Sequence, residues 1–98
     1  MEIINREFLN QLSKKASENE RLRINHNFHE SPDAPSQRLL NAMEPGTRIP
    51  VHKHDHTAET YVLLSGSTHI PAGQLHSLEV LEPGTVIFEC KDGPYMPI

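Results

Sequence analysis

Residues 46–66 read GTRIPVHKHDHTAETYVLLSG, and this stretch carries the strongest pattern in the 98-residue chain. It contains His52 and His54 two positions apart, and Glu59 follows after a bridge of four residues. Alternate residues of a strand leave the same face, so the two imidazoles are expected to converge and the carboxylate on the next strand to face them. Imidazole is the commonest metal ligand, and carboxylates share this role. The stretch therefore predicts a metal site.

A fourth candidate ligand, His76, follows the turn-forming residues Pro71 and Gly73. This turn is expected to deliver His76 onto a strand together with Leu78 and Val80. Three imidazoles and one carboxylate leave one or two coordination positions open for water or substrate, as catalytic metal sites do. The expected cofactor is one divalent metal ion (Zn, Fe, Mn or Ni). The predicted ligands are His52, His54, Glu59 and His76.

Short apolar runs separated by Pro/Gly turns surround this stretch. The tetrapeptide Glu-Pro-Gly-Thr occurs at residues 44–47 and again at 82–85, each time with Pro and Gly where a type II turn needs them. Strands are predicted at residues 21–29, 60–64, 75–81 and 85–89, and residues 37–43 are open to strand or helix by pattern alone. The tail from Lys91 to Ile98 is expected to be irregular.

The N-terminal region predicts the only helix, at residues 5–18. Asn5 can cap it, and an apolar stripe runs along it through Phe8, Leu9, Leu12 and Ala16. Together with the short strands, this helix indicates a small all-β barrel or sandwich with an N-terminal α-helix.

Composition excludes several classes of function. The chain has 9 Lys+Arg against 13 Asp+Glu, which gives none of the basic surface that nucleic-acid binding needs. The longest apolar run, at residues 61–64, is far too short to cross a bilayer. Cys90 is the single cysteine and the N-terminus lacks the apolar run of a signal peptide. We therefore expect a cytoplasmic protein with neither nucleic acid nor membrane as partner.

A second polar pattern lies on the predicted strand at residues 21–29, where polar and apolar residues alternate. This polar side is either a solvated sheet face or a surface that binds an anionic or hydroxylated ligand, because arginine suits bidentate contact with carboxylate or phosphate. The candidate substrate-binding residues are Arg21, Arg23, Asn25, Asn27 and His29.

The stretch at 46–66 resembles the first motif of the cupin superfamily, and residues 71–76 resemble the core of the second. The positions that match these motifs are Gly46, His52, His54, Glu59 and Gly66, then Pro71, Gly73 and His76. Residues 21–29, 37–42 and 88–95 are similar to the WbuC-type cupin-fold metalloproteins. The resemblance implies one domain over residues 1–98, with an N-terminal helix at about 5–18 and a single cupin (jelly-roll) barrel at about 21–95. In that fold, residues 37–43 are a strand.

The resemblance also implies a function. Members are associated with surface-polysaccharide (O-antigen) gene clusters, so the expectation is a metal-dependent isomerase or epimerase of a sugar or nucleotide-sugar, with the metal as Lewis acid. An Fe(II)-dependent dioxygenase and a non-catalytic sugar-binding or sensory module are the alternatives. The expected partner is a sugar-like, anionic small molecule. The tail, with Glu89, Lys91 and Tyr95, closes either the barrel or the edge of a homodimer.

One spacing departs from the jelly-roll pattern. A jelly roll has a hairpin of at least about 15 residues between its two motifs. Here only residues 67–70 separate Gly66 from Pro71. The spacing predicts a further hairpin between Ser67 and Thr68 in the natural polypeptide. The alternative is a genuine deletion, which would expose two strand edges.

Overall fold

The structure is a computed structural model that describes residues 2–47, 59–69 and 78–92, with the backbone alone at residues 59, 60 and 92. It begins with helix α1 (Arg6–Glu18), whose N-terminus is capped by Asn5. The Asn5 side-chain oxygen accepts the backbone N–H of Phe8 at 2.9 Å, which satisfies one of the amide groups that lack a partner in the first turn. Leu9, Leu12 and Ala16 are buried along one side of the helix. The predicted helix and its apolar stripe are confirmed.

All strand pairings in the described ranges are antiparallel. The strands are β1 (Arg23–Asn27), β2 (Ser36–Met43), β3 (Glu59–Ser65), β4 (Thr68–His69), β5 (Glu79–Val80) and β6 (Thr85–Asp92). They form a four-stranded sheet in the order β1-β2-β6-β3 and a two-stranded sheet of β4 and β5. An antiparallel β protein with one N-terminal helix is therefore confirmed. Within the described ranges the strands form two separate sheets, so the closed cupin barrel stays a prediction.

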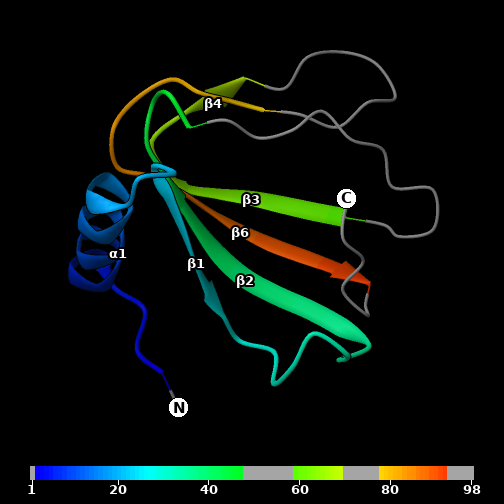
Figure 1. The fold of residues 1–98 in the computed structure, drawn as a ribbon. Coiled ribbons are helices and arrows are strands. Elements are labelled where there is room, and N and C mark those ends of the chain that lie inside the picture. Colours follow the sequence, from blue (N-terminus) through cyan, green and yellow to red (C-terminus); the bar gives the residue numbers. More distant parts are fainter. Residues whose placement is uncertain (1, 48–58, 70–77, 93–98) are drawn as a thin grey trace.

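Helix α1 covers one face of the large sheet, beside β1 and β2 (Figure 1). Its apolar stripe packs against Leu40, Ala42 and Val86, which are all nearly or fully buried. Burial of these side chains is the main source of stability on this face. Their spacing along β2 confirms that residues 37–43 form a strand, because Leu40 and Ala42 share the helix-covered face.

The opposite face of the large sheet packs against the two-stranded sheet. Met43 and Ile87 are buried there together with Val80 of β5, and the half-buried side chains of Tyr61 and Leu78 pack against them. The register assigns to this face the remaining alternate positions of β1, β2 and β6, namely Arg23, Asn25, Asn27, Gln37, Leu39, Asn41, Thr85, Glu89 and Lys91.

The two Glu-Pro-Gly-Thr turns have the glycine conformation that was predicted. Gly46 has φ +94° and Gly84 has φ +77°, in the region that a type II turn requires of its third residue. In the first turn the backbone N–H of Thr47 donates to the Glu44 carbonyl at 3.1 Å. These turns lead out of β2 and into β6, whose ends pair with each other.

Several strand boundaries differ from the prediction, most of all those of β1, β5 and β6. β1 begins at Arg23 because Leu22 has φ +58°, in a turn closed by its N–H donating to the Asn19 carbonyl at 2.9 Å. β6 continues to Asp92, because its last residues pair with the start of β2, so the irregular tail predicted from Lys91 onward is wrong for residues 91 and 92. Only residues 79 and 80 of the strand predicted at 75–81 are in β5, and 75–77 lie outside the described residues.

The connection after β3 is short. Gly66 ends the strand with φ +81°, and β4 begins two residues later. The Ser67 carbonyl accepts the N–H of Leu81 at 3.0 Å, and Thr68 pairs with Val80. The further hairpin expected between Ser67 and Thr68 stays a prediction.

Helix α1 has 13 residues, and no helix within the described ranges has the length and apolar character needed to cross a membrane.

Candidate functional site

The predicted metal ligands fall almost wholly outside the part of the chain that the structure describes. This holds for His52, His54 and His76, and for the side chain of Glu59. The backbone of Glu59 opens β3 and pairs with Lys91 of β6. Among the described residues, no group of three or more His, Cys, Asp or Glu side chains is arranged to hold a metal. The four-ligand site stays a prediction.

Of the predicted substrate-binding residues, Arg23 lies near Asn41 and Glu89. All three are on the face of the large sheet opposite α1. Arg23 pairs with Met43, so Asn41 is its diagonal neighbour on β2. The Asn41 side-chain Nδ2 donates to Glu89 Oε1 at 3.2 Å, which joins β2 to β6. We call these three residues the polar cluster.

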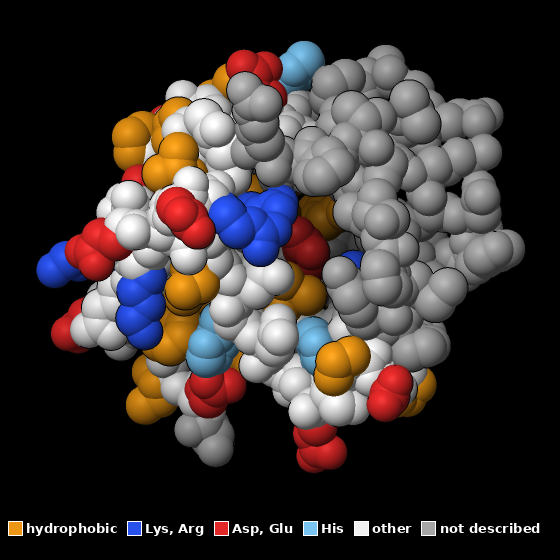
Figure 2. Space-filling model, viewed as in Figure 1, with side chains coloured by type: hydrophobic (Ala, Val, Ile, Leu, Met, Phe, Trp, Pro, Cys, Tyr) orange, Lys and Arg blue, Asp and Glu red, His pale blue; other side chains and the backbone are white. Residues whose placement is uncertain are grey.

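Charge at the polar cluster is set by burial and by neighbouring side chains. Burial lowers the pKa of the Arg23 guanidinium, the positive charge of Arg21 lowers it further, and the carboxylate of Glu89 raises it. Arg23 nevertheless stays a cation at neutral pH. No ion pair recorded for the described residues includes it. Figure 2 shows basic side chains beside a hollow, with an acidic side chain deeper within it.

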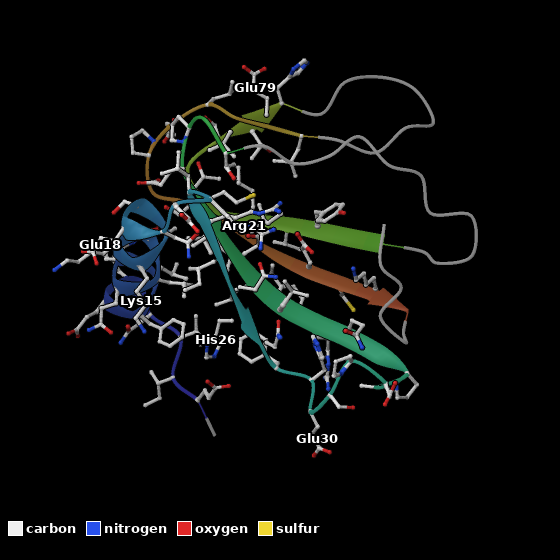
Figure 3. The ribbon with its side chains drawn as sticks, in the orientation of Figure 1. Lys15, Glu18, Arg21, His26, Glu30 and Glu79 are labelled. Atoms are coloured by element: carbon white, nitrogen blue, oxygen red, sulfur yellow. The ribbon has the colours of Figure 1, made fainter. Side chains whose placement is uncertain are left out.

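Arg21 is held beside the cluster by the turn that precedes β1. The Asn19 side-chain oxygen accepts its backbone N–H at 2.8 Å, and the hydroxyl of Thr47 donates to its carbonyl at 2.8 Å. The N–H of Glu44 donates to the Leu22 carbonyl at 2.9 Å. The first Glu-Pro-Gly-Thr turn therefore fixes the backbone of Arg21, whose side chain is exposed. Figure 3 shows Arg21 over the strands of the large sheet, whereas Lys15 and Glu18 lie on α1.

Asn41 carries the one buried side-chain polar atom that lacks a hydrogen-bond partner among the described residues, its Oδ1. The orientation of the amide follows from Glu89, because an ionised carboxylate only accepts hydrogen bonds and so draws the NH₂ group toward itself. A buried acceptor without a donor costs about 1–3 kcal/mol. The site therefore presents an acceptor that a donor from outside the described residues would satisfy.

The other predicted substrate-binding residues differ in position. Asn25 and Asn27 are exposed on β1, and Asn25 pairs directly with Asn41. His29 lies beyond the end of β1, where its Nδ1 is 3.1 Å from both the backbone nitrogen and the carbonyl oxygen of Arg38. Either tautomer of His29 therefore bonds to β2, which extends the β1–β2 pairing.

Two further histidines have carboxylate partners. The Nε2 of His26 lies 2.7 Å from Oε1 of Glu2, and its ring meets Phe8 and Phe28 edge-on. His69 and Glu79 face each other across β4 and β5, with 3.8 Å between Nδ1 and Oε2.

The sequence pattern did not indicate Asn41 or Glu89 as residues of the ligand site. A signal existed, because each is a polar residue with an apolar residue on either side of it in the sequence. Their partnership required the pairing of β2 with β6, which joins residues 48 positions apart.

Residues 4–72, more than half of the chain, match DUF6016, a domain of unknown function. The chain belongs to the DUF6016 family. The DUF6016 match includes α1, β1 to β4, Arg23 and Asn41, whereas Glu89 lies C-terminal to it. No curated protein and no solved structure matches the chain.

Proposed function

We propose that this chain is a metal-dependent enzyme that isomerises or epimerises a sugar or nucleotide-sugar in surface-polysaccharide biosynthesis. The observation that carries the proposal is the register of β3 against β6. Tyr61 pairs with Glu89 of the polar cluster, and Glu59, the predicted metal ligand two residues earlier, pairs with Lys91. The backbone of Glu59 therefore lies on β3 only two residues from Tyr61, which is the residue opposite Glu89 of the cluster.

The proposed fold is a jelly-roll barrel whose two walls are the four-stranded and two-stranded sheets. Its support is the apolar contact between these sheets, where Met43 and Ile87 pack with Val80. The polar cluster follows this apolar layer along β2 and β6, since Asn41 and Glu89 are each two residues beyond it. An apolar floor with a few convergent polar groups is typical of small-molecule sites.

The predicted ligand set of three imidazoles and one carboxylate suits a catalytic Zn, Fe, Mn or Ni ion by the chemistry of its donor atoms. When bound, such an ion would act as a Lewis acid that polarises a carbonyl or hydroxyl oxygen of the sugar. The residues of the polar cluster would bind and orient the substrate. Arg23 supplies hydrogen-bond donors, and Asn41 and Glu89 supply acceptors for hydroxyl groups.

The test is an NMR assay in deuterated water, with metal-loaded protein and a panel of hexose phosphates and nucleotide-hexoses. Isomerisation or epimerisation through proton removal from carbon incorporates deuterium at that carbon. We expect metal-dependent deuterium incorporation, which a chelator abolishes and one of the four metals restores.

Two outcomes contradict the proposal and favour its alternatives. Oxygen consumption coupled to product formation with Fe(II), without deuterium exchange, identifies a dioxygenase. Sugar binding without turnover under any of the four metals identifies a non-catalytic sugar-binding module.

A further inference from the structure

We infer that the polar cluster of Arg23, Asn41 and Glu89 is a subsite for a sugar that carries an anionic group. In this subsite Arg23 binds a phosphate or carboxylate, and the acceptor oxygens of Asn41 and Glu89 bind sugar hydroxyls. The inference rests on the proposed function, because it names the substrate class of the same site.

The need for hydroxyl donors follows from the geometry of Asn41. Its Nδ2 is used by Glu89 at 3.2 Å, and its Oδ1 is buried with no donor among the described residues. Turning the amide over would place Oδ1 against the carboxylate oxygen, so the orientation is fixed by charge. A hydroxyl can donate to Oδ1 and still accept from elsewhere, and a sugar supplies several of them.

The need for an anionic group follows from the charges beside Asn41. The positive charge of Arg21 acts on Arg23, and so does the carboxylate of Glu89. Among the described residues, the charged groups that act on Arg23 are one guanidinium and one carboxylate, so together with Arg23 they leave positive charge to be compensated. Arginine compensates it best with phosphate or carboxylate, whose oxygens match its planar donors.

The spacing suits one ligand that meets both needs. Arg23 and Asn41 are diagonal neighbours on paired strands, about 7–8 Å apart and within reach of a long side chain. A single sugar unit with its anionic substituent spans such a distance.

Binding to the full chain tests the inference without any need for turnover. Isothermal titration calorimetry would use hexose 6-phosphates, uronic acids, their neutral parent hexoses and inorganic phosphate, each with metal-loaded and metal-depleted protein. We expect at least one anionic sugar to bind tenfold or more tightly than its neutral parent. The phosphate and uronic-acid arms distinguish the two anionic groups.

Variants separate the two parts of the subsite. Arg23→Gln should weaken anionic-sugar and inorganic phosphate binding by about tenfold or more. Asn41→Leu should weaken the anionic sugar by a similar factor and leave inorganic phosphate unchanged. Asn41→Ser serves as a second variant in case the leucine variant does not fold. Arg38→Gln is the matched control, because Arg38 is exposed on the other face of β2 and should bind like the wild type.

Two results overturn the inference. One is equal affinity for anionic and neutral sugars, or no binding of any probe. The other is unchanged sugar binding in Arg23→Gln or in the folded Asn41 variants, which would mean that solvent alone satisfies the cluster. The proposed function fails separately, when the wild type binds an anionic sugar through these residues but turns over none with any metal.

Discussion

The carboxylate of Glu44 accepts a hydrogen bond from the backbone N–H of Gly84, with 2.7 Å between Oε2 and N. These residues belong to the two copies of Glu-Pro-Gly-Thr, so the side chain of the first turn binds the backbone of the second. The turns flank the pair of Met43 and Thr85, where β2 ends and β6 begins. The contact therefore holds the β2–β6 register that brings Asn41 to Glu89.

Replacement of Glu44 by alanine should reduce stability. We expect the free energy of unfolding to fall by about 1–2 kcal/mol, because the acceptor is charged and the contact is partly buried. Urea denaturation measures this loss. Glu82→Ala is the matched control, since Glu82 holds the same position in the second turn but is exposed and accepts the Ser67 hydroxyl at 3.0 Å. We expect a loss below about 0.5 kcal/mol there, and equal losses would refute the assigned role of Glu44.

We expect replacement by alanine to destabilise the protein more at Gly66 than at Gly84. A Cβ at Gly66 would overlap the Thr85 hydroxyl oxygen and lie 2.6 Å from the Thr85 Cα, whereas a Cβ at Gly84 would meet nothing within 4 Å. Both residues have positive φ, which costs alanine about 1–2 kcal/mol. Gly66→Ala must in addition displace backbone, so we expect it to lose about 3 kcal/mol or more. Thermal and urea unfolding measure the stability of both variants. A smaller loss of stability in Gly66→Ala than in Gly84→Ala would contradict the prediction.

Replacement of the buried Gln37 should also reduce stability. Its side chain is 2% exposed, and its Nε2 donates to the carbonyls of Ala34 at 3.0 Å and Pro32 at 3.3 Å. Gln37→Leu keeps the size of the side chain but leaves these carbonyls without their donor. We expect a loss of about 1–3 kcal/mol in urea denaturation. Ser36→Ala, at the exposed neighbouring position, should unfold like the wild type, and an unaffected Gln37→Leu variant would contradict the role given to the amide.

Local signals allowed the helix and the turns to be predicted. Asn5 caps α1 through a residue three positions away, and the conformations of Gly46 and Gly84 are properties of four-residue turns. Each of these features depends on chemistry within one short segment. The sequence of the segment was therefore enough to predict the feature.

Features that depend on distant contacts were beyond the sequence pattern. The carbonyl of Leu22, in the turn that interrupts the strand-like alternation, accepts the N–H of Glu44 from beyond β2, and no residue near Leu22 indicates this contact. The Asn41–Glu89 hydrogen bond requires β6 to lie beside β2 in the sheet. Arg23 was predicted as a ligand-binding residue from alternation alone, whereas its burial and its charged neighbours depend on the sheet order.

The predicted metal site implies that only some of the seven histidines are needed to bind the metal. His52→Ala and His76→Ala should each sharply reduce the bound metal, because loss of one of four ligands removes a bond and the geometry of the site. His26→Ala and His69→Ala are controls, since these imidazoles face Glu2 and Glu79. The controls should keep the metal content of the wild type, and a loss in them equal to that in His52→Ala would point to a different ligand set.

The metal content of the purified chain, measured by elemental analysis, tests the proposed metal-dependent function most directly. The account predicts about one divalent ion per chain in the wild type. It also predicts close to none in the double variant His52→Ala/His76→Ala, measured under conditions in which circular dichroism shows that the variant is folded. Full retention of the metal in that variant would contradict the predicted site, and with it the proposed enzyme.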